Sequence, residues 1–157
     1  MNPGLEKALM LVEKHHVYST PSYPHLHEIL LQEGLLVKFF SFNGGITGVY
    51  CRTFDGIELL TLKNGLGETE LKHMLAYGLA FHCLSSAPAL SAYIKVMRDC
   101  PKQGFDDDVE NFASILLVPP QVRLDYDRIT PDEVISLARI SEALAKRRIN
   151  IARWFRI

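Results

Sequence analysis

Residues 70–82 have the sequence ELKHMLAYGLAFH and form the centre of a long predicted helix, which covers about residues 68–83. The pair Asn64-Gly65 precedes this helix and is a strong turn signal. His73 and Tyr77 are four residues apart, so they share one helix face. His82 is nine residues beyond His73, about half a turn out of phase, and we expect it to face away from that pair.

Three segments before this helix are rich in strand-forming residues, at 35–42, 47–54 and 57–62, and turn signals separate them at residues 43–45 and 55–56. Helical patterns or helix-start signals predict helices around the strands, at residues 3–16, after Ser22, and at 90–97, 106–118, 131–138 and 141–156. The predicted class is α+β. We expect a small three-stranded antiparallel sheet packed with about five to seven helices in a single domain, residues 1–157, whose part from about residue 130 is helical.

Composition excludes several classes of protein. The chain has 157 residues, 22% of them charged, with a formal net charge of −1, so no global field attracts it to nucleic acid. Three cysteines without a CxxC pair favour reduced thiols over a disulfide framework. The amino-terminal stretch carries Glu6, Lys7, Glu13 and Lys14, which is unlike a signal peptide. We therefore expect a cytoplasmic protein without a membrane partner.

A second informative stretch, residues 108–119, has the sequence DVENFASILLVP. Together with residues 57–64 and the His73 helix, it resembles the ImmA/IrrE family of zinc metallopeptidases, over roughly residues 5–145. In that family a strand and a turn lead into a helix carrying HExxH. A later helix has an acidic residue four positions before a Phe-Ala pair and ends in Leu-Leu-x-Pro. The resemblance implies a zincin-like domain.

In an HExxH helix the two histidines share one face and bind zinc, while the glutamate activates the metal-bound water. By resemblance, His73 occupies the first histidine position and Tyr77 the second. Met74 stands where the catalytic glutamate is expected, and Asp108 stands at the third, acidic ligand. A methionine cannot act as a general base, so we predict no catalytic residue. The metal set His73, Tyr77 and Asp108 is then vestigial.

Two interpretations of this degenerate motif remain open. Glu70 lies three positions before His73 and could substitute as a ligand on the same helix face. Alternatively, the helix is now ordinary core, with His73 hydrogen-bonded to Tyr77 or Asp108. In both cases the resemblance implies that the two helices pack side by side with His73 and Asp108 facing each other. We expect no cofactor, and zinc is the metal that a retained site would hold.

The carboxyl terminus carries a basic cluster interleaved with aromatic residues: Lys146, Arg147, Arg148, Arg153, Trp154, Phe155 and Arg156. Such a pattern can bind nucleic-acid phosphates, but it is more often a solvated helix face with apolar anchors. The near-neutral net charge also argues against nucleic acid as a partner.

Family members are commonly encoded in mobile elements and cleave, or relieve, helix-turn-helix repressors. The resemblance therefore implies a pseudoenzyme in transcription regulation: a non-catalytic protein-binding or regulatory module whose partner is a protein, with a helix-turn-helix repressor as the candidate. One alternative is an active zinc metallopeptidase with a rearranged site that cleaves such a repressor. A further alternative is a DNA-associated regulator that uses the basic carboxyl-terminal helix.

Overall fold

The computed structural model describes residues 1–85 and 91–157. Within these ranges the fold is α+β, with six helices and one four-stranded sheet. The helices are α1 (Pro3–Lys14), α2 (Tyr23–Gln32), α3 (Glu68–Leu84), α4 (Asp107–Leu117), α5 (Pro131–Ala138) and α6 (Glu142–Phe155). The strands are β1 (Leu35–Phe40), β2 (Ile46–Arg52), β3 (Glu58–Lys63) and β4 (Tyr93–Arg98).

The sheet differs from the predicted three-stranded antiparallel sheet. Its strand order is β1-β3-β2-β4. The β2–β3 hairpin is antiparallel, as its Asp55-Gly56 turn predicts, but β1 pairs with β3 in parallel. The turn signal at residues 43–45, after β1, predicts only that the chain changes direction there. It does not predict which strand pairs with β1.

The helix predicted at residues 90–97 is also wrong. Residue 90 lies outside the described residues, and residues 93–98 form β4, which pairs antiparallel with β2 along the other edge of the sheet. Its sequence, YIKVMR, repeats two apolar residues and a cation with a period of three, whereas the exposure of its side chains alternates with the period of two that a strand has. Hydrogen bonding to β2 therefore makes this segment a strand, and the local sequence pattern alone does not decide between strand and helix.

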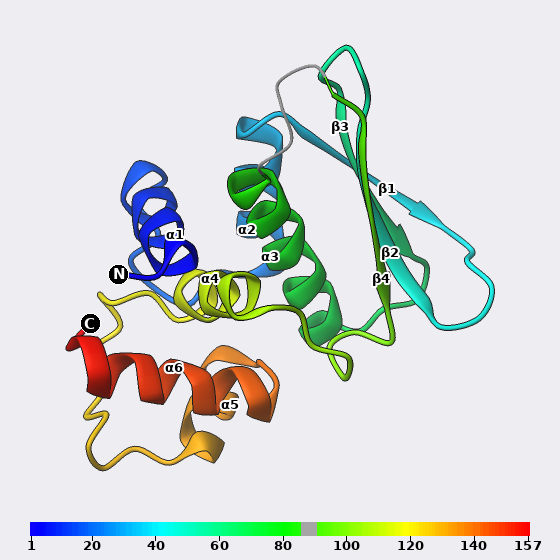
Figure 1. The fold of residues 1–157 in the computed structure, drawn as a ribbon. Coiled ribbons are helices and arrows are strands. Elements are labelled where there is room, and N and C mark those ends of the chain that lie inside the picture. Colours follow the sequence, from blue (N-terminus) through cyan, green and yellow to red (C-terminus); the bar gives the residue numbers. More distant parts are fainter. Residues whose placement is uncertain (86–90) are drawn as a thin grey trace.

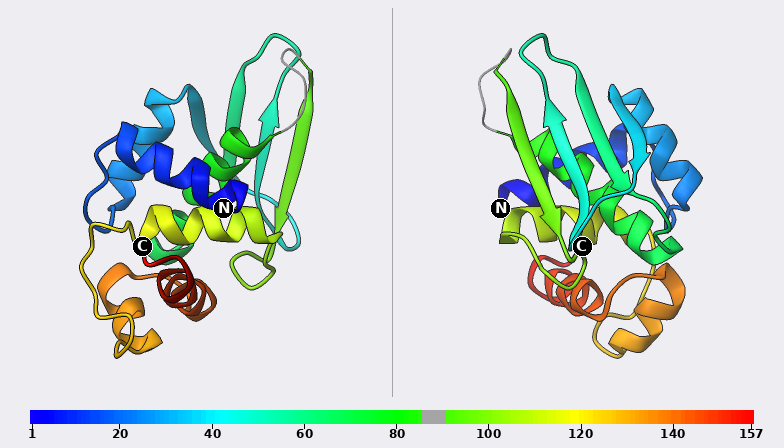
Figure 2. Two further views of the ribbon diagram at one scale, coloured as in Figure 1. Left: turned by 60° about the vertical axis from the view of Figure 1, so that its left-hand side comes forward. Right: turned by 90° about the vertical axis from the view of Figure 1, so that its right-hand side faces the viewer.

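All the described helices lie on one side of the sheet (Figure 1). Helix α3 packs against the inner face, where Tyr50, Leu60 and Met97 are fully buried. Gly78 allows this close approach, because a Cβ at that position would lie 2.6 Å from Leu60 Cδ2. In the right view of Figure 2 the sheet stands in front of the helices, and no described helix covers its outer face.

The carboxyl-terminal pair α5 and α6 lies beyond α4, on the side away from the sheet (Figure 1). Local signals position both helices. Thr130 and Glu133 form the predicted capping box of α5, and the Ser141 side chain accepts from Leu144 N–H at the start of α6. Among the described residues, no helix combines the length and the apolar character needed to span a bilayer.

Candidate functional site

His73 is fully buried in the second turn of α3. Its Nε2 accepts a hydrogen bond from the backbone N–H of Ser141, at 3.1 Å. An accepting Nε2 carries no proton, so the proton of the neutral ring is on Nδ1, which has no partner among the described residues. Burial, followed by the charge of neighbouring Lys72, lowers the pKa of His73 to about 4. The ring is therefore neutral at pH 7, and the Nε2 lone pair that could bind a metal instead accepts the Ser141 N–H.

Three contacts from the first half of α3 hold the connection between α5 and α6. The nearly buried Lys72 donates from Nζ to the carbonyl of Ala138, the last residue of α5. Arg139 follows with a left-handed backbone and pairs with Glu68 at 2.7 Å. The His73–Ser141 bond is the third contact. The position that resembles a first zinc ligand thus fastens the carboxyl-terminal helices to the core.

Tyr77 packs edge-on against His73, with ring centroids 6.0 Å apart. Its hydroxyl donates to the buried carboxylate of Glu110 on α4, with oxygen distances of 3.1 and 3.2 Å. Glu110 also accepts from the Phe105 N–H at 2.9 Å. Burial, reinforced by Glu110, raises the pKa of Tyr77 far above its usual range, so this residue is a neutral phenol and not a phenolate ligand.

The carboxylate that faces α3 is therefore Glu110, whereas the resemblance indicated Asp108. Asp108 accepts a hydrogen bond from the Asn2 side chain at the start of α1. Its neighbours have structural partners as well: Asp106 caps α4 through Val109 N–H, and Asp107 pairs with Arg147 at 3.1 Å. Residues 108 and 110 differ by about 200° around the helix, so only one of them can point at α3.

Met74 and Glu70 complete the set of predicted site residues. Met74 is fully buried and brings an apolar side chain to the position of the expected base. Glu70 is exposed in the first turn of α3 and contributes to none of the contacts described above. The structure thus brings together His73, Met74 and Tyr77 from the prediction, adds Glu110, and places Asp108 and Glu70 elsewhere.

A cavity of about 190 Å³ lies against this cluster, where the loop before α4 meets the start of α6. Residues from four segments line it, among them Tyr77, Phe105, Glu110, Ser141, Ala143 and Arg147. Its wall combines aromatic surface with a carboxylate and a guanidinium. Among the described residues, no group of three or more His, Cys, Asp or Glu side chains is arranged to hold a metal ion.

The basic carboxyl-terminal cluster divides into buried and exposed residues. Arg148 is fully buried; it donates to the carbonyls of Val118 and Ile157 at 2.6 and 3.0 Å and lies over the Tyr126 ring. Lys146 pairs with Glu142 at 2.8 Å, and Arg147 pairs with Asp107. Arg153 also donates from Nε to the Tyr126 carbonyl at 2.8 Å, so four of the five cations in this cluster have partners within the fold.

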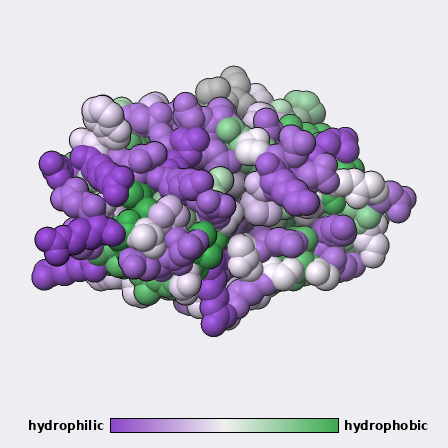
Figure 3. Space-filling model, turned by 90° about the horizontal axis from the view of Figure 1, so that it is seen from below, coloured by the Kyte–Doolittle hydropathy of each residue, from purple (hydrophilic) through white to green (hydrophobic). Residues whose placement is uncertain are grey.

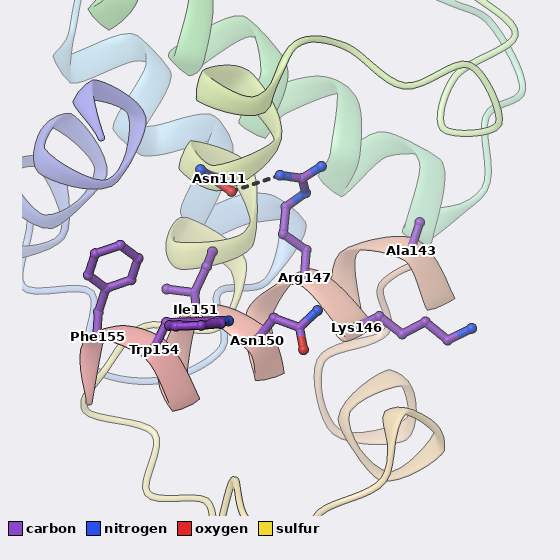
Figure 4. A pocket seen from close by; sticks show the side chains of 8 residues that line it. All are labelled: Asn111, Ala143, Lys146, Arg147, Asn150, Ile151, Trp154 and Phe155. Carbon is purple, nitrogen blue, oxygen red and sulfur yellow. Dashed lines mark hydrogen bonds between the residues drawn. The ribbon is translucent and has the colours of Figure 1, made fainter. Parts of the chain in front are cut away.

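A second cavity, of about 450 Å³, lies between α4 and the exposed side of α6. Figure 4 shows Arg147 reaching Asn111, whose side-chain oxygen is 2.9 Å away, while Trp154 and Phe155 stand at the far end. Trp154 is 83% exposed. The underside of the molecule, where α5 and α6 lie, is mostly hydrophilic with scattered apolar groups (Figure 3). This surface therefore combines solvated polar side chains with exposed apolar groups such as Trp154.

Comparison with family models, with curated proteins and with solved structures gave no match for this chain.

Proposed function

We propose that this chain is a cytoplasmic, degenerate metallopeptidase-like protein of the ImmA/IrrE type, which binds a protein partner without hydrolysing it. The observation that carries the proposal is the state of the HExxH-like helix. His73 Nε2 accepts the Ser141 N–H, Tyr77 donates its hydroxyl to Glu110, and Met74 is apolar and buried.

These residues do not fit a catalytic zinc ion. Such an ion needs the free lone pairs of deprotonated ligands, an open coordination position and a base for the bound water. Here one imidazole lone pair is occupied by an amide, and the phenol is neutral. The thioether of Met74 cannot take a proton from water.

A binding role is compatible with what remains. The 190 Å³ cavity beside Tyr77 and Glu110 carries aromatic, acidic and basic groups on one wall, so it can accept both side chains and backbone groups of a peptide. The resemblance points to a helix-turn-helix repressor as the partner and to transcription regulation in a mobile element as the setting.

The test is to titrate a purified helix-turn-helix repressor into the full chain by calorimetry and to examine the repressor afterwards by mass spectrometry. We expect binding with the repressor left intact. Exposed Ala143 lines the cavity, so Ala143→Arg should weaken binding at least about ten-fold. Ser136→Arg adds the same charge on an exposed position of α5 and should have no effect.

Three outcomes would contradict the proposal. Absence of binding removes the protein-binding role. Cleavage of the repressor that His73→Ala abolishes would instead establish the rearranged metallopeptidase. Binding to operator DNA that charge reversal of Arg153 and Arg156 abolishes would favour the DNA-associated regulator.

A further inference from the structure

The outer face of the sheet is unusually apolar for a surface exposed to water. Side chains alternate between the two faces of a strand. Because Leu60, Leu62, Tyr50 and Met97 are buried on the inner side, the intervening residues point outward. These outward residues, which define the outer sheet face, are Leu36, Lys38 and Phe40 of β1, Leu59, Thr61 and Lys63 of β3, Val49 and Cys51 of β2, and Ile94, Val96 and Arg98 of β4.

The strand register aligns the apolar members of this face into a continuous row. Leu36 pairs with Leu59, Leu59 with Cys51, and Cys51 with Ile94. The row therefore crosses all four strands, and at its ends Leu36 is 50% and Ile94 66% exposed. An antiparallel sheet with one solvated face normally places polar residues outward. A contiguous exposed apolar surface is typical of an interaction site.

The charges on the outer sheet face all have one sign. Lys38, Lys63 and Arg98 lie on it, and none of its outward positions is acidic. None of the three cations forms an ion pair within residues 1–85 and 91–157. An occupant must therefore bring carboxylates along the side of its apolar surface.

The dimensions of the row match a single helix. Neighbouring strands are about 4.8 Å apart, so the row from β1 to β4 is roughly 14 Å long. A helix rises about 1.5 Å per residue, and a segment of about 10–14 residues spans that distance. The same strands already hold α3 on their inner face (Figure 1).

A second copy of the chain fits this face poorly. A two-fold interface brings identical surfaces together, and here each copy would present the same three cations with no acid to receive them. We propose that the outer sheet face binds an amphipathic helix of another protein, with an apolar stripe flanked by aspartate or glutamate. This surface is separate from the cavity at Tyr77 and Glu110. The proposal for the outer sheet face and the proposed function can therefore be refuted independently of each other.

The probe is a fluorescein-labelled peptide of 14 residues with leucines at helical spacing flanked by glutamates. Its controls are a scrambled peptide of the same composition and a copy with lysine in place of glutamate. We expect the full chain to prefer the patterned acidic peptide over the scramble by about ten-fold or more. Lys38→Glu with Arg98→Glu should reverse the preference toward the lysine peptide, a gain that misfolding cannot imitate. Arg153→Glu on α6 is the matched control and should leave binding unchanged.

Cys51 supplies an independent readout, since it lies in the apolar row and is only partly buried. The bound acidic peptide should slow its alkylation, and the scramble should not. Equal affinity for the acidic peptide and its scramble overturns the proposal. Alkylation of Cys51 at an unchanged rate in the presence of the acidic peptide also overturns it. Dimers by light scattering that Lys38→Glu dissolves would assign the face to a second copy. Binding to phosphatidylserine vesicles but not to the peptide would assign it to a lipid surface.

Discussion

His73 Nε2 lies 3.1 Å from the backbone nitrogen of Ser141, the residue that caps α6. One imidazole on α3 thus accepts the N–H of the residue that precedes α6, 68 positions further along the chain. This contact, with the Lys72–Ala138 bond next to it, gives α3 a structural role in joining the carboxyl-terminal helices to the core.

The first prediction concerns pH and stability. The folded-state pKa of His73 is about 4, below the value near 6.5 expected for an unfolded chain. Between these values the unfolded state binds the extra proton, so the free energy of unfolding falls as the pH drops from 6.5 to 4. The full loss is about 3 kcal/mol. Urea titrations at several pH values measure it.

His73→Gln keeps an acceptor for the Ser141 N–H and does not titrate. We expect this variant to lose most of the pH dependence between 4 and 6.5. The same substitution at exposed His16 should preserve it. An unchanged slope in His73→Gln would show that His73 is not the responsible group.

The second prediction concerns the buried Tyr77–Glu110 pair. Tyr77→Phe removes one of the two donors to the Glu110 carboxylate and should lower the free energy of unfolding by about 1–3 kcal/mol. Tyr18→Phe, at an exposed tyrosine, should change it by much less. Equal effects at the two positions in urea unfolding would mean that the pair contributes nothing specific.

The third prediction concerns zinc. We expect the chain, purified without an affinity tag, to hold well below one zinc per molecule by elemental analysis, because the His73 lone pair and the Tyr77 hydroxyl are both engaged. The double substitution Met74→Glu with Tyr77→His completes an HExxH sequence and should gain zinc, because with a second imidazole beside it the metal can displace the Ser141 N–H from the His73 lone pair. Adding Glu110→Ala should reduce that gain, whereas Asp108→Ala should not. Stoichiometric zinc in the parent that depends on His73 and Asp108 would refute this arrangement.

The fourth prediction concerns activity. We expect no cleavage of a helix-turn-helix repressor or of an unfolded protein, with or without added zinc, in a discontinuous assay read by electrophoresis. General-base assistance contributes about 10²–10⁴ in rate, and Met74 cannot provide it. Cleavage by the parent that disappears in His73→Ala would show that another group supplies the base.

Local signals predicted most of the helices. The α5 capping box at Thr130, the Ser22 cap of α2 and the Pro119 stop after α4 each act within a few residues, and they were sufficient to position those elements. The spacing of His73 and Tyr77 on one helix face also follows from helix geometry alone. His82 indeed faces away from them, toward Glu58 of β3 at 2.8 Å.

Local signals could not predict the contacts between segments that lie far apart in the sequence. The parallel pairing of β1 with β3 and the strand β4 depend on which strand becomes the neighbour. The choice of Glu110 over Asp108 depends on the rotation of α4 against α3, which the sequence of α4 leaves open because its first turn carries acidic residues that point in several directions around the helix.

By itself, the sequence determined the α+β class, the helix that carries His73, and the apolar Met74 beside His73 on that helix. Those properties depend on residue type and local spacing. Only the tertiary structure decided that His73 accepts from Ser141, that Glu110 meets Tyr77, and that the apolar row on the outer sheet face is continuous. Each of these joins segments far apart in the chain, and packing chooses such partners by shape, burial and the need to satisfy buried polar groups.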